Sequence, residues 1–157
     1  MIEQSFSLLP FAMADIPAVT ITGQVSLRDQ RLIVQYLLAG DIHAVSLAEE
    51  SANPGRKDEL WKHTCFELFL AIKDQPQYWE FNFSPSGDWN VYRIEGYRRI
   101  DFREETSIQR VQPEIGRRSD SLSLEVVVDL SSIVQEGEQI KMGVTAVVRT
   151  TDGRESY

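Results

Sequence analysis

Short runs of β-forming residues, separated by turn residues, constrain the fold of this chain more than any other feature. The clearest runs cover residues 18–27, 31–38, 64–72, 78–83, 89–94, 122–130 and 140–150. No long segment shows the 3.6-residue period of an amphipathic helix, and there is no internal repeat. This pattern is typical of an all-β, antiparallel β-sandwich with a jelly-roll-like arrangement. We expect a single domain over residues 1–157, with at most one or two short helical turns.

Weaker patterns suggest further elements between and around these runs. The turn at residues 28–30 predicts a hairpin between the first two runs. Residues 8–11 are expected to open the first strand, and residues 42–47 are expected to add another. A helical turn is expected at residues 129–134, and its candidate caps are Asp129 and Ser131.

Residues 64–72 and 78–83 form the most informative pair, because both runs alternate and a short turn at residues 73–76 joins them. Burial requires the apolar sides of both runs to lie on one face of the sheet. The residues of this apolar face are Phe66, Leu68, Leu70, Trp79, Phe81 and Phe83. Two registers satisfy the condition, one opposing Glu67 to Asn82 and the other opposing Glu67 to Ser84.

Both registers place Glu67 and Asn82 close together on the face that points away from the core. The neighbours of Glu67 on its own run, Cys65 and Phe69, are apolar, so we expect a partly desolvated carboxylate that needs a hydrogen-bond partner. Alternating polar residues are also typical of a plain solvated face, and this reading stays open for Glu80.

Trp61 precedes Glu67 by six residues, which places both side chains on the same face of an extended chain. A flat ring beside carboxylate and amide groups suits a sugar, whose C–H face stacks on the ring while its hydroxyls bond to the polar groups. Aromatic residues with polar ends are also common at any binding surface.

Residues 89–99 are rich in Trp, Tyr and Arg, but the direction of their side chains is ambiguous. If Val91 faces the core, Tyr92 and Asn90 join Glu67 on the polar face. If Tyr92 faces the core, Trp89 and Arg93 join Glu67 instead.

Residues 61–70 and 78–89 resemble the DOMON-like superfamily, and within it the family-nine type carbohydrate-binding modules. Those modules show a Trp, a hydrophobic-Glu-hydrophobic-Phe strand, and an aromatic-rich strand that ends in a polar residue and Gly. The resemblance implies a β-sandwich that holds a sugar between aromatic rings, with Trp61 as one ring and Glu67 as a hydroxyl acceptor. The candidates for a second ring are Trp89, Tyr92 and Tyr157.

The expected function is therefore non-catalytic binding of a saccharide or similar polar small molecule on one sheet face. The expected ligand-binding residues are Trp61, Glu67, Asn82, Trp89, Tyr92 and Arg93. A haem or redox domain is an alternative, because some DOMON relatives resemble cytochromes. Its candidate axial ligands are His43, His63 and Met142. A protein-interaction module is a further alternative that needs no special residues.

An enzyme is the less favoured class, because the sequence contains no nucleophile elbow, phosphate loop or His-Glu metal motif. Glu67 and Glu80 form a pair of carboxylates, which is the arrangement used in glycoside hydrolysis. His63 and Cys65 would share a face on a strand, although Cys65 is expected to be a buried small apolar residue.

The formal net charge of −8 disfavours nucleic acid and anionic membranes as partners. The single cysteine excludes an intramolecular disulfide and fits a reducing compartment. Neither a secretory signal nor an apolar run of membrane-spanning length is evident, so we expect a cytoplasmic protein. No cofactor is expected, although relatives of this fold can carry structural calcium or haem. Open sheet edges make a homodimer credible.

Overall fold

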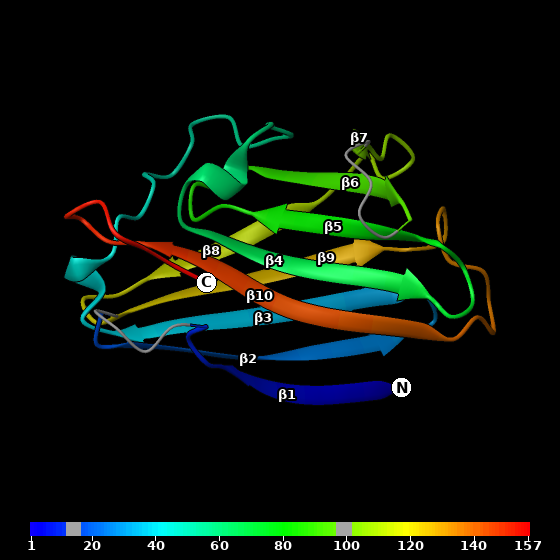
Figure 1. Ribbon diagram of the computed structural model, residues 1–157, viewed down its shortest axis with the longest axis horizontal. Coiled ribbons are helices and arrows are strands. Elements are labelled where there is room, and N and C mark those ends of the chain that lie inside the picture. The colour runs from blue at the N-terminus through cyan, green and yellow to red at the C-terminus, as the bar shows by residue number, and fades with distance from the viewer. Residues whose placement is uncertain (12–16, 97–101) are drawn as a thin grey trace.

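Two antiparallel β-sheets face each other across one apolar core in the computed structural model, which describes residues 1–11, 17–96 and 102–157 (Figure 1). The first sheet contains, in spatial order, β1 (Ile2–Leu8), β2 (Val19–Arg28), β3 (Arg31–Gly40), β9 (Ser121–Asp129) and β8 (Gln112–Arg117). The second contains β11 (Glu155–Ser156), β10 (Ile140–Arg149), β4 (Cys65–Ile72), β5 (Gln77–Phe83), β6 (Trp89–Glu95) and β7 (Phe102–Glu104). This arrangement confirms the antiparallel β-sandwich that the run pattern predicts.

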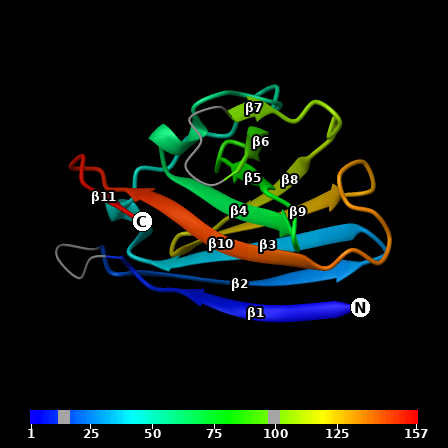
Figure 2. The same cartoon turned by 45° about the vertical axis from the view of Figure 1, so that its right-hand side comes forward.

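The two sheets lie face to face in Figure 2. The core between them is built by period-two alternation along the long strands. Leu68 of β4 and Phe81 of β5 are fully buried, and Leu38 and Leu122 face them from the other layer. Tyr36 of β3 joins the two layers, because its hydroxyl donates to the backbone oxygen of Glu67 at 2.8 Å.

The central hairpin adopts the first of the two registers expected for it. Phe66 opposes Phe83 and Glu67 opposes Asn82, and the connecting turn lies between Ile72 and Gln77. The register follows from burial, because a shift by one residue would turn the apolar face of one strand toward solvent.

The hairpin between β2 and β3 is also confirmed, with Arg28 opposite Arg31. The two residues of its turn, Asp29 and Gln30, have φ values of 49° and 63°. Positive φ at both central residues is typical of the type I′ turn, whose twist matches that of the flanking strands.

Two of the strands expected from weaker patterns were wrong. The first strand is β1 rather than residues 8–11, because Pro10 has no amide hydrogen to donate to a sheet. The segment expected as a strand at residues 42–47 forms η1, the 3-10 helix Ile42–Ala44, followed by an isolated bridge from Val45 to Thr150. The helical turn expected at residues 129–134 is present as a single turn, in which the backbone oxygen of Leu130 accepts from the amides of Ile133 at 2.9 Å and Val134 at 2.8 Å. Asp129 caps it by accepting a hydrogen bond from the backbone of Ser131 at 2.9 Å.

The helices of the described residues are two 3-10 turns of three residues each, η1 and η2 (Leu60–Lys62). None of the helices in this part of the chain is long and apolar enough to cross a membrane.

Candidate functional site

The outer face of the second sheet brings polar and aromatic side chains into two adjacent rows across the strands. One row contains Thr145, Glu67, Asn82 and Asn90. The next contains Phe69, Glu80, Tyr92 and Glu104. The strands β10, β4, β5, β6 and β7 each supply members of these rows, because neighbouring residues alternate between the core and this face.

The segment before β4 covers one end of this face and is held there by Arg56. The Arg56 guanidinium donates to Asn90 Oδ1 at 2.8 Å and to the backbone oxygen of Glu105 at 3.0 Å. It also lies over the ring of Trp89, 4.6 Å from its centroid. Backbone hydrogen bonds from Lys57 to Trp89 and from Trp89 to Gly55 continue this attachment. The next turn of the segment is η2, which places Trp61 over the sheet.

A groove of about 440 Å³ lies on this face beside η2. Its lining includes Trp61, Glu67, Glu80, Arg149, Glu155 and Tyr157. Arg149 Nη2 lies 2.9 Å from Glu155 Oε2, and the Tyr157 hydroxyl donates to the same carboxylate. Trp61 and Tyr157 therefore border one groove from distant parts of the chain.

Two carboxylates of this groove, Glu67 and Glu80, are partly desolvated. Glu67 is 8% exposed, and its Oε2 accepts a hydrogen bond from Thr145 Oγ1 at 2.7 Å. Burial raises the pKa of Glu67, and the Thr145 hydrogen bond opposes that shift. Burial and then the charge of Glu67 raise the pKa of Glu80 to about 7, and the nearby Asn82 amide opposes this.

Asn82 lies opposite Glu67 and is 0% exposed. Neither the nitrogen nor the oxygen of its side-chain amide reaches hydrogen-bond geometry with any partner. Buried polar groups are normally hydrogen-bonded, and the interaction that this amide does have is with Glu80, whose pKa it lowers.

Trp61, Tyr92 and Phe102 form a compact cluster on the same face. The Trp61 ring centroid lies 5.5 Å from that of Tyr92 and 5.9 Å from that of Phe102, and Tyr92 and Phe102 are 5.3 Å apart. The three rings, with Tyr78, Glu80 and Ile94, line a hollow of about 240 Å³, here called the aromatic pocket. The Tyr92 hydroxyl donates to Asp58 and accepts from Asn90 at 3.0 Å, and burial followed by the Asp58 contact raises its pKa.

The structure brings together four of the six residues expected at the site. Trp61, Glu67, Asn82 and Tyr92 share the outer face, where Asn82 is covered. Val91 is buried in the core, which selects the first of the two orientations considered for β6.

Trp89 and Arg93 lie on the opposite side of β6, so the expectation that they join Glu67 was wrong. Trp89 packs into the core cluster, and the Arg93 guanidinium lies 5.8 Å from the centroid of the Trp79 ring. Their positions follow from Val91, because residues two apart on a strand face the same side.

Arg149, Thr145 and Phe102 were not expected at the site, and Glu80 was expected to be either a solvated residue or half of an acid pair. Arg149 and Thr145 belong to β10, and no local sequence pattern reveals which strand lies beside β10 in the sheet. Phe102 lies in β7, a strand of three residues that is too short to give a periodic signal.

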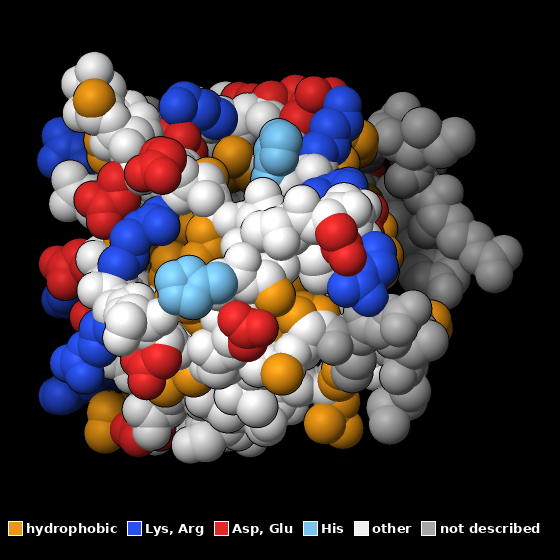
Figure 3. All heavy atoms as spheres, turned by 90° about the vertical axis from the view of Figure 1, so that its left-hand side faces the viewer, with side chains coloured by type: hydrophobic (Ala, Val, Ile, Leu, Met, Phe, Trp, Pro, Cys, Tyr) orange, Lys and Arg blue, Asp and Glu red, His pale blue; other side chains and the backbone are white. Residues whose placement is uncertain are grey.

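The candidate haem ligands lie on separate elements: His43 in η1, His63 directly after η2, and Met142 on β10. The end of the sandwich in Figure 3 has histidine side chains at its surface. Within the described residues, no group of three or more His, Cys, Asp or Glu side chains could hold a metal ion. Cys65 is buried as expected, and burial together with the charge of Glu67 raises the pKa of its thiol.

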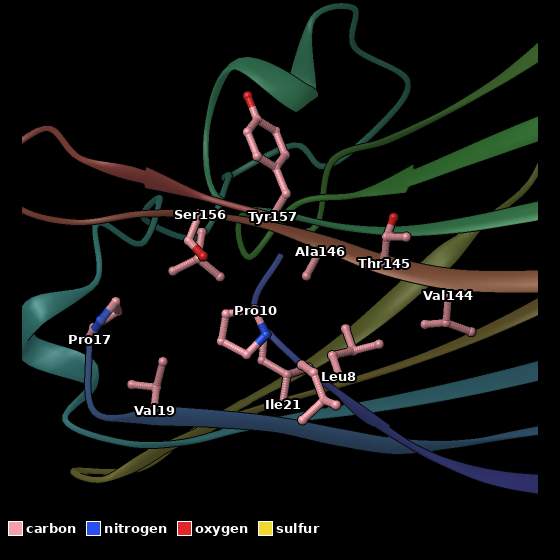
Figure 4. A pocket seen from close by; sticks show the side chains of 12 residues that line it. Leu8, Pro10, Pro17, Val19, Ile21, Val144, Thr145, Ala146, Ser156 and Tyr157 are labelled. Atoms are coloured by element: carbon pink, nitrogen blue, oxygen red, sulfur yellow. The ribbon is translucent and has the colours of Figure 1, made fainter. Parts of the chain in front are cut away.

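A separate apolar hollow of about 140 Å³ opens at the edge of the sandwich, between the ends of β1 and β2 and strand β10. Figure 4 shows Leu8 and Ile21 on one side of it and Val144 and Ala146 on the other. The ring of Tyr157 points away from this hollow, which leaves it available to the groove on the outer face (Figure 4).

No protein-family model matches the chain, and no curated protein sequence matches it significantly. Among solved structures, the fold is similar to that of a Bacteroides uniformis protein described as a "putative carbohydrate-binding protein". The similarity has a TM-score of 0.67 at 12% sequence identity and covers 98% of this chain and 75% of the other. At this identity the likeness establishes a shared fold.

Proposed function

We propose that this protein is a non-catalytic binding domain for a saccharide or a similar polyhydroxylated small molecule. The observation that carries the proposal is the groove itself, in which Trp61 and Tyr157 border a floor that contains Glu67 and Glu80. An aromatic ring can stack on the apolar face of a sugar, and carboxylates can accept hydrogen bonds from its hydroxyl groups.

The remaining polar groups of the groove support the same chemistry. Arg149 offers a planar set of donors, and its Nε is buried without a hydrogen-bond partner. Asn82 adds a buried amide under the floor. The resemblance of residues 61–70 and 78–89 to family-nine type carbohydrate-binding modules points in the same direction, as does the description of the Bacteroides uniformis protein.

Calorimetric titration with a panel of monosaccharides and oligosaccharides tests the proposal. We expect at least one sugar to bind, and we expect Glu67→Gln and Tyr157→Ala each to weaken that binding by about tenfold or more, which corresponds to the loss of a hydrogen bond to a charged group or of a stacking ring.

Glu114→Gln is the matched control, because Glu114 is an exposed carboxylate on β8 in the other sheet. If no sugar of the panel binds, or if Glu67→Gln and Tyr157→Ala both bind with unchanged affinity, the groove is not a sugar site.

A further inference from the structure

The aromatic pocket differs in shape from a sugar platform. The planes of Trp61 and Tyr92 meet at 73°, those of Trp61 and Phe102 at 88°, and those of Tyr92 and Phe102 at 84°. Rings nearly at right angles to one another share no common flat surface for stacking. They suit a compact, rounded group that contacts several rings at once.

The depth of the pocket follows from how strongly each ring is covered. Tyr92 is 2% exposed and forms the floor, whereas Phe102 is 51% exposed and forms part of the rim. The Tyr92 hydroxyl is bonded to Asp58 and Asn90, so Tyr92 contributes its ring to the pocket. The hollow of about 240 Å³ is below the usual range of ~300–1,000 Å³ for whole-ligand sites, so it suits a head group.

Glu80 is the charged residue in the lining of this pocket, and the charges around it are mostly negative. Glu67 lies on the adjacent strand β4, Glu104 lies on β7 in the row of Glu80, and Asp58 bonds to Tyr92. The basic side chains at the neighbouring groove already have acidic partners. Lys62 Nζ lies 2.7 Å from Glu59, and Arg149 pairs with Glu155.

A cation near Glu80 would therefore relieve an existing electrostatic cost. Burial and the charge of Glu67 raise the pKa of Glu80 to about 7, which means that the ionised form is disfavoured in the empty pocket. Electron-rich ring faces attract ammonium groups, and rings combined with a carboxylate are the usual means of binding alkylated ammonium groups.

We propose that the aromatic pocket binds the alkylated ammonium head group of a small organic cation, with the rings around the head group and Glu80 as its counter-ion. This goes beyond the saccharide groove. Trp61 and Glu80 border both hollows, whereas Phe102 lines the pocket and Tyr157 lines the groove.

An NMR titration of the full chain with choline and with 3,3-dimethyl-1-butanol, its uncharged carbon counterpart, tests the proposal. At about pH 8, where Glu80 is ionised, we expect choline to bind at least about tenfold more tightly than the alcohol. Equal affinity for both compounds, or no binding of choline, would overturn the proposal.

Two variants locate the site. Phe102→Ala and Glu80→Gln should each weaken choline binding by about fivefold or more, because they remove a ring face and the counter-charge. Phe102→Leu keeps an apolar side chain without the ring, and it should behave like Phe102→Ala. The matched controls are Phe11→Ala, at a ring that is 91% exposed, and Glu114→Gln on the other sheet. Unchanged choline affinity in both Phe102 variants would contradict the assignment.

The two proposals fail independently in this design. Phe102→Ala should lose choline and keep any sugar that binds the groove, and Tyr157→Ala should do the reverse. If the protein binds choline but no sugar, the proposal of the cation pocket stands and only the proposal of the saccharide groove fails.

Discussion

Glu67 and Glu80 are diagonal neighbours on adjacent strands, and their chemistry depends on that placement. Glu67 has a hydroxyl partner in Thr145, whereas Glu80 lies among rings and is disfavoured as an ion by burial and by Glu67. Two carboxylates with the same intrinsic acidity thus acquire different roles. Glu67 can therefore serve as a hydrogen-bond acceptor, and Glu80 can serve as the counter-ion of a bound cation.

The pKa of Glu80 should be about 7, and Glu67→Gln should lower it because the like charge is removed. Carboxyl carbon NMR across the acidic and neutral range measures both values. A Glu80 resonance that titrates at the ordinary value of 4.5 would show that the pocket is better solvated than its geometry indicates.

The raised pKa of Glu80 also makes stability depend on pH. The folded state holds this proton more tightly than the unfolded state, so stability falls as the pH rises from 4.5 to about 7. Glu80→Gln should match the wild type in unfolding free energy near about pH 4 and exceed it at about pH 8. Urea unfolding at the two pH values measures this difference.

The stability of the two-layer sandwich depends strongly on strand β5, because the apolar face of this strand points into the core. Phe81 is 0% exposed, so Phe81→Ala should lower the unfolding free energy by about 3–5 kcal/mol. Urea denaturation checks the value, and Phe11→Ala should stay within about 0.5 kcal/mol of the wild type. A normal melting curve for Phe81→Ala would show that Phe81 does not face the core and that the face assignment of the hairpin is wrong.

Arg56 is a main side-chain anchor of the segment that carries Trp61, beside the backbone hydrogen bonds of Gly55 and Lys57 with Trp89. Removing its hydrogen bonds and its contact with Trp89 in Arg56→Ala should cost roughly 2–4 kcal/mol and weaken binding at both hollows. Arg56→Lys should recover only part of the loss, because an ammonium group cannot reproduce the planar set of donors.

Urea unfolding combined with the choline titration measures both effects of the Arg56 variants. Arg28→Ala is the control, because Arg28 forms an exposed ion pair with Asp29. If Arg56→Ala unfolds normally and binds choline normally, the segment is held by other contacts.

At the scale of the whole molecule, one core cluster spans both sheets and includes side chains from β2 to β10. We therefore expect residues 1–157 to unfold as one cooperative unit. Tryptophan fluorescence reports Trp79 and Trp89 in the core, and far-ultraviolet circular dichroism reports the strands. The two transitions should coincide in urea, and separated midpoints would indicate more than one folding unit.

Much of the architecture could be predicted because period-two alternation is a local property. The runs at residues 64–72 and 78–83 predicted the central hairpin, its apolar face and the proximity of Glu67 to Asn82, since burial of one face permits few registers. The polar edge strands β1 and β8 escaped prediction, because a strand that is solvated along one edge needs no strong apolar pattern.

The composition of the site depended on contacts between distant segments. The pairing of β10 with β4 brings Thr145 to Glu67 and Arg149 to the groove, and the pairing of β10 with β11 brings Tyr157 there. Trp61 reaches the same face because Arg56 fixes its segment to β6. The sequence by itself determined which residues of the central hairpin face the core and that Glu67 lies near Asn82, because alternation and burial act within a strand. Only the tertiary structure decided the orientation of β6 and which outward residues of distant strands meet, because strand order is set by packing energy summed over the whole sandwich.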